Sequence, residues 1–258
     1  MSTFEQGFAE VQRTAEATVK AATGMTTIAK QLARAARQGD IAAIRRLSDR
    51  LRAQAEAARQ EAGGAGDAWP FDPDGEEAYL RESYEEELLA AAAAGGLRID
   101  RRDGALVSFP SIVRILPGAR AIKVDRRKLP MLRPSTVVDA LLASQTKKPA
   151  FPTERFLETL FRSYRLIVGD RGMGSVAQLA TVYESLTLMP GTAAEYGADD
   201  FARDLFLLDR SGITSTKSGA HVSLPASTGT RSARGVFTFV APDGRVVSYY
   251  GIRFDAAP

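Results

Sequence analysis

The sequence predicts an α+β protein with three parts: an N-terminal antiparallel helical hairpin, a middle helix plus β-hairpin element, and a C-terminal winged-helix-like domain. Three patterns support this prediction. A heptad of mostly small apolar residues fills the N-terminal part, short apolar runs follow residue 97, and helices followed by two strands lie after residue 150. The expected divisions are a hairpin at 1–62, a linker at 63–77, the middle element at 78–148 and the winged-helix-like domain at 149–258.

The hairpin is predicted from an apolar seam whose members lie alternately three and four residues apart. Ser2 and Glu5 have the spacing of a capping box, so a helix is expected from about residue 4 to 38. Gly39 and Asp40 then end this helix and cap a second one. The seam consists of Phe8, Val11, Ala15, Thr18, Ala22, Met25, Ala29, Leu32 and Ala36, followed by Ile41, Ile44, Leu47 or Ser48, Leu51, Ala55 and Ala58.

This seam also predicts a role in binding. Alanine side chains bury little apolar area, so the hairpin is not expected to be stable alone. It should pack on the rest of the protein, on a copy of itself or on a partner chain. The candidates for that contact are the larger seam residues, namely Phe8, Val11, Met25, Leu32, Ile41, Ile44 and Leu51.

Residues 63–77 are interpreted as a linker because they combine glycines, prolines and aspartates without a period. Trp69 and Phe71 within this segment are expected to anchor it on a neighbouring surface. An acidic helix is expected next, from about residue 75 to 94. A hairpin turn at Pro117-Gly118 is expected between the last two of four short apolar strands, which lie at 97–100, 105–109, 111–116 and 121–124.

The part after residue 150 resembles a winged helix, a helix-turn-helix variant, in the order of its elements over about residues 150–254. Ser175 and Gln178 have capping-box spacing at the start of one expected helix. Asp199 is expected to cap the next helix, in the position of a recognition helix. Asp243-Gly244 then forms the turn of a final two-stranded hairpin.

Composition excludes several classes of protein. The 258 residues include no cysteine and one histidine, which rules out disulfides and thiolate chemistry and leaves little for a zinc site. No apolar run approaches the roughly 18 residues of a membrane span, and the N-terminus does not have the pattern of a secretory signal. We therefore expect a cytoplasmic protein that uses no metal, no cofactor and no membrane.

The stretch RLIVGDRGMGSVAQLATVY, residues 165–183, raises the question of a phosphate-binding loop. A P-loop needs the pattern G-x-x-x-x-G-K-[ST], and Gly169 and Gly174 have its glycine spacing. However, Ser175 and Val176 occupy the places of the lysine and of the magnesium-binding hydroxyl. We therefore interpret the segment as a turn, and nucleotide binding there is kept as an alternative.

Two other groups of residues are candidates for catalysis or metal binding. His221 lies in a strand-like segment without a nucleophile motif, so we expect it to be exposed or hydrogen-bonded for structure. Asp200 and Asp204 share one face of the expected helix and could hold a metal, but Arg203 and Arg210 beside them favour a solvated face. Neither group predicts an enzyme.

Charge is distributed unevenly along the chain. Residues 67–96 carry 1 basic and 9 acidic side chains, whereas residues 97–134 carry 10 basic and 3 acidic ones. Clustered arginines and lysines typically contact phosphates, and pairing with the acidic helix at 76–87 is the alternative. The nucleic-acid-binding candidates are Arg114, Arg120, Lys123, Arg126, Arg127, Lys128 and Arg133, together with Lys217, Arg231 and Arg234 on the expected wing.

Three functions are compatible with these patterns. The leading hypothesis is a non-enzymatic accessory or adaptor subunit of an intracellular assembly acting on nucleic acid, which binds a partner chain through the N-terminal helices and phosphates through the basic middle segment. In architecture the chain resembles the small winged-helix accessory subunits of chromosome-organising or DNA-defence ATPase complexes. The second hypothesis is a dimeric winged-helix transcriptional regulator, which the acidic recognition-helix segment, DDFARDLFLLDRSG, does not favour. The third is an enzyme that binds a phosphorylated substrate or nucleotide at the loop 169–175.

Overall fold

The structure is a computed structural model that describes residues 2–102, 104–147, 151–225 and 235–256. It combines helices with antiparallel sheets and is 58% helical, which confirms the α+β class. The chain divides into two compact units. Unit 1 comprises Met1–Ala91, Pro117–Arg120 and Met131–Val137, and unit 2 comprises Ala92–Leu116, Ala121–Pro130 and Val138–Pro258.

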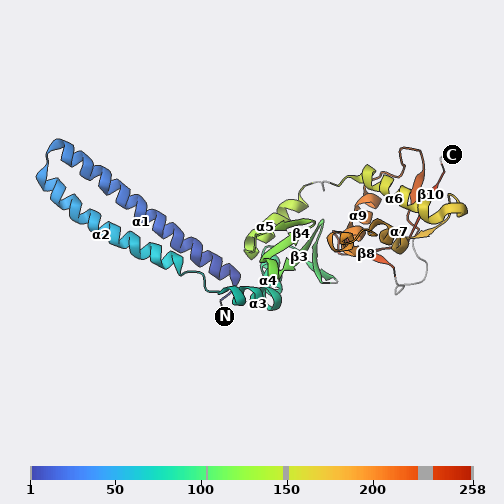
Figure 1. Ribbon diagram of the computed structural model, residues 1–258, viewed down its shortest axis with the longest axis horizontal. Helices are drawn as coiled ribbons and strands as arrows, with labels where there is room; N and C mark the ends of the chain where they lie inside the picture. Colours follow the sequence, from blue (N-terminus) through green and yellow to red (C-terminus); the bar gives the residue numbers. More distant parts are fainter. Residues whose placement is uncertain (1, 103, 148–150, 226–234, 257–258) are drawn as a thin grey trace. The chain divides into compact units, whose positions relative to one another are not determined.

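Unit 1 begins with two long helices, α1 (Phe4–Gln38) and α2 (Ile41–Gly66), which lie side by side (Figure 1) and which we call the arm. Gly39 joins them in the left-handed region, at φ 72°, which glycine adopts without a steric cost. Asp40 then caps α2 by accepting a hydrogen bond from the Ala43 amide at 2.9 Å. The bounds predicted for the first helix are confirmed.

The capping box of α1 lies one residue later than predicted. Thr3 and Gln6 form it, in place of Ser2 and Glu5. Glu5 is engaged elsewhere, because its carboxylate accepts hydrogen bonds from the amide and the hydroxyl of Ser135, each at 2.9 Å. The Glu5 carboxylate thus joins α1 to the last segment of unit 1 in sequence and takes no part in the capping box.

The contact between α1 and α2 has a small core. Its buried residues are Ile28, Ala35 and Leu47, with Leu32, Ala43, Ile44 and Leu51 packed around them. The Gln54 amide also donates a hydrogen bond to the Ala21 carbonyl at 3.2 Å, which fixes the register of the two helices. Among the 26 residues of α2, all of them described, Leu47 alone is buried. Most of the surface of the arm therefore faces solvent within unit 1.

An aromatic cluster forms the base of the arm. Phe4 is 1% exposed, and its ring centroid lies 4.7 Å from that of Tyr79 and 4.9 Å from that of Phe71. Trp69 packs on Phe4 and Phe8 at 5.4 and 4.8 Å. The two aromatic residues of the expected linker thus anchor it on α1. Its two ends are helical, because α2 continues to residue 66 and the next helix begins at residue 73.

The single acidic helix predicted at about 75–94 is interrupted. The structure has α3 (Pro73–Glu82) and α4 (Tyr84–Ala94), separated by Ser83 at φ −128°. The Glu87 amide donates to the Ser83 carbonyl, which begins the hydrogen-bonding pattern of α4. Tyr84, directly after the break, is fully buried against Phe4, so packing of aromatic rings accompanies the interruption.

Unit 2 contains a five-stranded antiparallel sheet where the sequence predicts one hairpin with two flanking strands. The turn into its last strand is made by Asp125, a non-glycine residue at φ 54°, whose carboxylate accepts a hydrogen bond from the Ile112 amide at 3.1 Å. This local bond offsets the cost of the left-handed conformation. The strands, in both chain and sheet order, are β1 (Asp100–Arg102), β2 (Ala105–Ser108), β3 (Ser111–Leu116), β4 (Ala121–Val124) and β5 (Arg127–Leu129).

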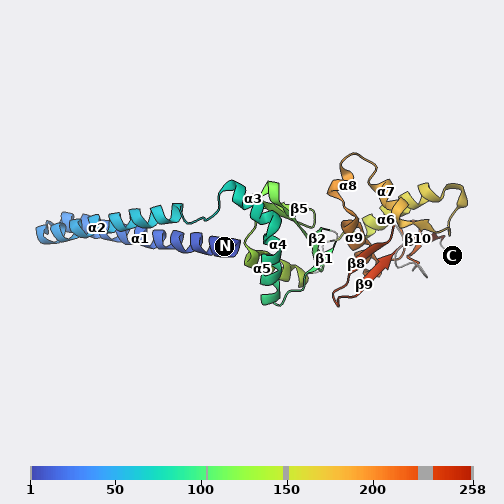
Figure 2. The same ribbon diagram turned by 90° about the horizontal axis from the view of Figure 1, so that it is seen from below.

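The rest of the described chain alternates helices and short strands. Two further antiparallel sheets have the strand orders β6-β10-β7 and β8-β9. Figure 2 labels β8, β9 and β10 of these sheets. The helices are α5 (Pro134–Gln145), α6 (Thr153–Val168), α7 (Leu179–Leu186), α8 (Thr192–Glu195) and α9 (Ala198–Arg210). The strands are β6 (Ala177–Gln178), β7 (His221–Ser223), β8 (Phe237–Val240), β9 (Val246–Tyr249) and β10 (Gly251–Asp255).

The core of unit 2 is built around α9. Phe201 is fully buried, and its ring contacts those of Tyr183 and Phe237 at centroid distances of 5.4 and 4.8 Å. Phe206 packs on Phe239 of β8 at 5.3 Å. Helix α9 therefore contributes aromatic side chains to the centre of the unit and packs against the β8-β9 hairpin.

Two predicted helix starts are wrong. Helix α7 begins after residue 178, because Ala177 and Gln178 pair with β10 as a strand and the Ser175 hydroxyl bonds to the Arg171 carbonyl at 3.1 Å. Helix α9 begins before Asp199, with Gly197 as its N-cap. Its third residue, Asp200, reaches back to the Gly197 amide at 3.2 Å. Tertiary pairing and buried charge thus outweigh the local capping signals.

Candidate nucleic-acid interface

The predicted cations of the central β-hairpin bond to a backbone carbonyl of α8 and to carboxylates of α9. Arg114 lies on β3 opposite Lys123 of β4. The Arg114 guanidinium donates to Asp200 at 3.2 Å and to Asp199 at 3.1 Å, and it is 22% exposed. The Lys123 ammonium donates to the Glu195 carbonyl at 3.3 Å. These two cations therefore stabilise the packing within unit 2.

Two further candidates are engaged within unit 1. Arg120 donates to the Glu76 carboxylate at 2.5 Å and to the Pro73 carbonyl at 2.9 Å. Arg133 donates to the Glu5 carboxylate at 2.7 Å and to the Gln12 side chain at 2.6 Å. Of these pairs, the one between Arg120 and Glu76 joins the basic run to the acidic helices, which is the alternative that the sequence left open.

The remaining candidates differ in exposure. Arg126 is 51% exposed on its side chain, lies 3.7 Å from Asp204 and sits 5.4 Å from the centroid of the Tyr196 ring. Its neighbours on β5, Arg127 and Lys128, are exposed. Lys217 is also exposed, and its backbone amide donates to Glu158 at 2.6 Å. Arg231 and Arg234 lie outside the described residues.

Charged residues of α9 lie in the core rather than on the solvated face that the sequence predicts. Asp200 is 1% exposed, Arg203 6% and Asp204 2%. Arg203 donates to Asp204 at 3.0 Å and forms a second ion pair with Asp125. The Tyr196 hydroxyl also donates to Asp204 at 3.0 Å. Of these partners, Asp125 lies 78 residues from Arg203 in sequence, and the local charge pattern cannot indicate that ion pair.

Burial and neighbouring charges together shift the pKa values of these groups. Burial raises the pKa of Asp204, although Arg203, Tyr196 and Arg126 act in the opposite direction. Burial by itself lowers the pKa of Arg203, but the neighbouring carboxylates of Asp204 and Asp125 outweigh it and the pKa is raised overall. Burial next to Asp204 raises the pKa of Tyr196 as well. The raised pKa of Tyr196 favours its neutral phenol, which donates the hydrogen bond to Asp204.

Helix α9, to which the sequence assigns the position of a recognition helix, is covered on most of its surface. Eight of its 13 residues are buried, all of them within the described chain, and they include both charged and aromatic side chains. An α-helix must present an exposed face to enter the DNA major groove. Most of α9 is covered by the rest of unit 2.

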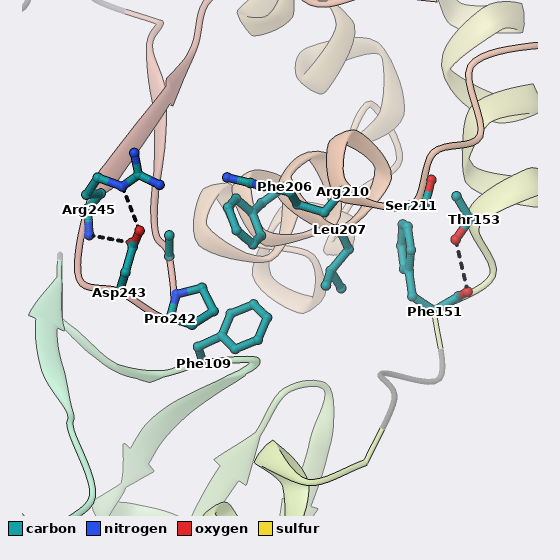
Figure 3. A pocket seen from close by; sticks show the side chains of 11 residues that line it. Phe109, Phe151, Thr153, Phe206, Leu207, Arg210, Ser211, Pro242, Asp243 and Arg245 are labelled. Carbon is teal, nitrogen blue, oxygen red and sulfur yellow. Dashed lines mark hydrogen bonds and ion pairs between the residues drawn. The ribbon is translucent and has the colours of Figure 1, made fainter.

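Three hollows in the surface of unit 2 share one aromatic residue, Phe151, which is half-buried. The first, of about 580 Å³, has apolar walls that include Phe109, Phe206 and Leu207, and carries Arg210 near Phe206 (Figure 3). Its rim includes an exposed ion pair between Asp243 and Arg245 at 2.6 Å, drawn as a dashed line in Figure 3.

The other two hollows are lined by cations. One, of about 550 Å³, is lined by Arg126, Arg127, Lys147 and the buried Arg203, as well as by Asp125. The other, of about 420 Å³, is lined by Arg126, Arg155, Tyr196 and Asp204. The sequence did not single out Lys147, Phe151 or Arg155. The sequence around these residues is basic and aromatic on both sides of a proline-containing break. No spacing rule connects this segment to residues 126 and 127.

The partner-binding candidates of the arm mostly face inward. Leu32, Ile44 and Leu51 pack around the small core between α1 and α2, and Phe8 belongs to the aromatic base. Val11 and Met25 are half-buried on the same seam. Ile41, at the turn, is 66% exposed, as is Val19 on the outer face of α1, which the seam did not include.

The other candidates for chemistry have simple surroundings. The Nδ1 atom of His221, an exposed residue, lies 2.9 Å from the Ser215 hydroxyl. Gly169, Gly172 and Gly174 have positive φ angles of 46°, 75° and 89°, so the glycines provide the backbone conformations of a turn. Among the described residues, no group of three or more His, Asp or Glu side chains could hold a metal ion, and no helix could cross a membrane.

Comparison with known proteins gives no relative on which a function could rest. No protein-family model matches the chain, and neither a curated protein nor a solved structure is similar to it.

Proposed function

We propose that the protein is a non-enzymatic accessory or adaptor subunit of a multi-protein assembly that acts on nucleic acid. In this proposal the arm binds a partner chain, and basic side chains of unit 2 contact the phosphate backbone. The observation that carries it is the arm itself, a pair of long helices whose inner seam is closed internally and whose outer faces are exposed.

The construction of the arm supports a role in binding. A pair of 35- and 26-residue helices is held by a core of three buried residues, Ile28, Ala35 and Leu47, which is small for the length of chain that it orders. Its base, in contrast, is fixed by Phe4 and by the Glu87 carboxylate, which accepts hydrogen bonds from the amides of Phe4 and Glu5 at 3.2 and 2.8 Å. A long, mostly exposed element with a fixed base is suited to presenting a surface to another chain.

The order of elements in unit 2 supports a winged-helix-like arrangement. Strand β6 lies between α6 and α7, the sheet order is β6-β10-β7, and the β8-β9 hairpin is inserted between β7 and β10 in the position of a wing. Because α9 is buried, this arrangement favours a contact with protein, or with phosphates through other surfaces, over sequence-specific reading of DNA. This weakens the alternative of a transcriptional regulator.

Fewer side chains are placed to contact phosphates than the basic run implies. Arg114, Arg120, Lys123 and Arg133 already bond to groups within the protein. Arg127 and Lys128, adjacent on the edge strand β5, are exposed and remain the best-placed cations of the run. A surface with few phosphate contacts gives weak, salt-sensitive and sequence-independent binding, which suits an accessory subunit.

The experiment that tests the partner-binding role is a shortened arm. The bond between Gln54 and Ala21 sets where the helices face each other, so residues 22–38 and 41–53 are deleted and the Gly39-Asp40 turn joins Ala21 to Gln54. This variant keeps the aromatic base. Tagged full-length and shortened chains are expressed in the native host, and the proteins that co-purify are quantified.

The expected result is a stoichiometric partner that the full-length chain recovers and the shortened chain does not. The control is far-UV circular dichroism and thermal unfolding of the shortened chain, which should retain a cooperative transition because unit 2 is unchanged. A stoichiometric partner recovered equally by both chains would reject the arm as the binding element. Sedimentation of the purified full-length chain distinguishes a foreign partner from self-association.

A further inference from the structure

The two basic hollows of unit 2 meet at shared side chains. Both are lined by Arg126 and Phe151, and together they are lined by further cations at Arg127, Lys147 and Arg155. We call these two hollows the Phe151 groove. Their volumes, about 550 and 420 Å³, lie in the range of sites that hold a small organic group such as a nucleotide.

The acidic residues in the groove do not cancel its positive charge. Asp125 accepts bonds from the Ile112 amide and from Arg203, and Asp204 accepts bonds from Arg203 and Tyr196. Both carboxylates are therefore already paired or hydrogen-bonded inside the protein. Arg127, Lys147 and Arg155 are exposed, so their charges face solvent at the groove and attract an anion.

Phe151 gives the groove an aromatic surface among these charges. Its side chain is half-buried and meets the Phe156 ring at a centroid distance of 5.4 Å and an interplanar angle of 62°. Contact with a second ring limits its motion, and Figure 3 shows the ring among the residues that line the adjoining apolar hollow. A positioned aromatic ring flanked by cations is the combination that stacks a base and neutralises its phosphates.

We infer that the Phe151 groove binds single-stranded nucleic acid, with a base packed against Phe151 and phosphates held by Arg127, Lys147 and Arg155. This inference rests on the proposed contact with nucleic acid and specifies its form. In a duplex the bases are stacked on each other, and a half-buried ring inside a hollow cannot reach their faces. Unpaired bases can enter the hollow, and stacking there does not depend on sequence.

The test compares three nucleic acids of equal length with the purified full-length protein. These are oligothymidine of about 16 nucleotides, a duplex of the same length, and an abasic strand that keeps the phosphates and lacks the bases. Fluorescence anisotropy measures the Kd for each at about 50 and 200 mM salt. We expect oligothymidine to bind more tightly than both the duplex and the abasic strand.

Substitutions then assign the contact to residues. Phe151→Leu keeps apolar bulk and removes the ring, so it should weaken oligothymidine binding about 5- to 100-fold and leave the abasic strand unaffected. Phe151→Tyr keeps the ring and should restore most of the affinity. Arg127→Gln should lower the slope of log K against log salt by about 0.7, because one phosphate contact is lost. The matched control is Arg162→Gln on α6, which removes the same charge from an exposed side chain that does not line the groove.

Each contrary outcome has a definite meaning. Equal affinity for the three probes, unchanged in Phe151→Leu, overturns the inference and leaves a general phosphate contact in place. Equal losses in Arg127→Gln and Arg162→Gln would show a phosphate contact spread over the surface of unit 2 and not held in the groove, which also overturns it. No binding of any probe at about 50 mM salt rejects the nucleic-acid part of the proposed function itself, while the arm experiment still tests the partner-binding part.

Discussion

Helices α2 and α9 contain similar kinds of residues, but α2 is mostly exposed to solvent and α9 is mostly buried. Both mix arginines and acidic residues with apolar residues, yet α2 buries one of its 26 residues and α9 buries eight of its 13. In α2, Arg59 and Glu56 form an ion pair at 2.8 Å with 77% and 53% of their side chains exposed. In α9, Arg203 and Asp204 form one at 3.0 Å with 7% and 3% exposed.

The difference shows that the neighbourhood, and not the composition, decides what a charged helix does. Helix α2 packs mainly on α1 and forms only a small core with it, so its charges remain in water. Helix α9 is covered by α6 and β8, and its charges meet Arg114 and Asp125 of the sheet. One helix thereby remains available to a partner, whereas the other becomes part of the core. Four predictions test this contrast.

The largest expected effect is on the core around α9. Phe201→Ala removes a fully buried ring and should lower the free energy of unfolding by about 3–5 kcal/mol, as measured by urea denaturation. Leu47→Ala in the arm is the matched comparison, because it also removes a buried side chain. It should increase amide hydrogen exchange in α1 and α2 and leave α9 unchanged. A global loss in Leu47→Ala as large as that in Phe201→Ala would contradict the contrast.

The next effect concerns the two ion pairs. Asp204→Ala leaves Arg203 buried with one carboxylate fewer, and the free energy of unfolding should fall by about 3 kcal/mol. Glu56→Ala breaks the exposed pair of α2, and the urea midpoint should not change measurably, because exposed pairs are screened by water. An equal shift of the urea midpoint in both variants would contradict the conclusion that the charged network of α9 is buried.

A smaller effect is expected at the start of the arm. Glu87→Gln replaces a carboxylate that accepts bonds from the amides of Phe4 and Glu5 and from the Tyr79 hydroxyl. The glutamine side chain has one acceptor oxygen where the carboxylate has two. We therefore expect the free energy of unfolding to fall by about 1–2 kcal/mol. Glu82→Gln, an exposed residue at the end of α3, makes the same change in charge as a control. Thermal unfolding of both variants at neutral pH separates loss of the cap from loss of charge.

The sequence predicted best those elements that depend on neighbours along the chain. The apolar seam sets the bounds of α1, and Gly39 and Asp40 place the turn, because helix period and capping are local properties. The turn at Asp243-Gly244 between β8 and β9 is local as well. Such features require no knowledge of the rest of the fold.

The sequence failed where partners are distant. Arg114 bonds to Asp200, which lies 86 residues away, and Arg203 bonds to Asp125, which lies 78 residues away. Because of these pairs, the face of α9 that was expected to be solvated is a buried network. Arg114, which the sequence predicted to contact phosphate, is bonded within the protein. Phe151 likewise gains its surroundings from β5, α6 and α9, so that its place in the groove could not be read from the residues beside it.

The smallest effect concerns the pH dependence of the arm's base. Burial by itself raises the pKa of Glu5, but hydrogen bonds from Ser135 and Arg133 outweigh it, so the pKa lies below its ordinary value of 4.5. The unfolded chain therefore binds a proton at Glu5 more readily than the folded chain does. The contribution of Glu5 to the free energy of unfolding is complete above about pH 4.5 and is lost as the pH falls through the folded pKa.

Glu5→Gln removes this dependence. Urea midpoints measured at about pH 6 and pH 3.5 should differ less in the variant than in the wild type. Glu10→Gln on the same helix is the control: Glu10 pairs with Arg13 in full contact with water, and its loss should leave the difference between the two midpoints nearly unchanged. Equal pH dependence in the wild type and Glu5→Gln would mean that Arg133 and Ser135 do not hold Glu5 in the folded chain. The base of the arm would then be fixed by its aromatic cluster and by the Glu87 carboxylate, without the Glu5 carboxylate.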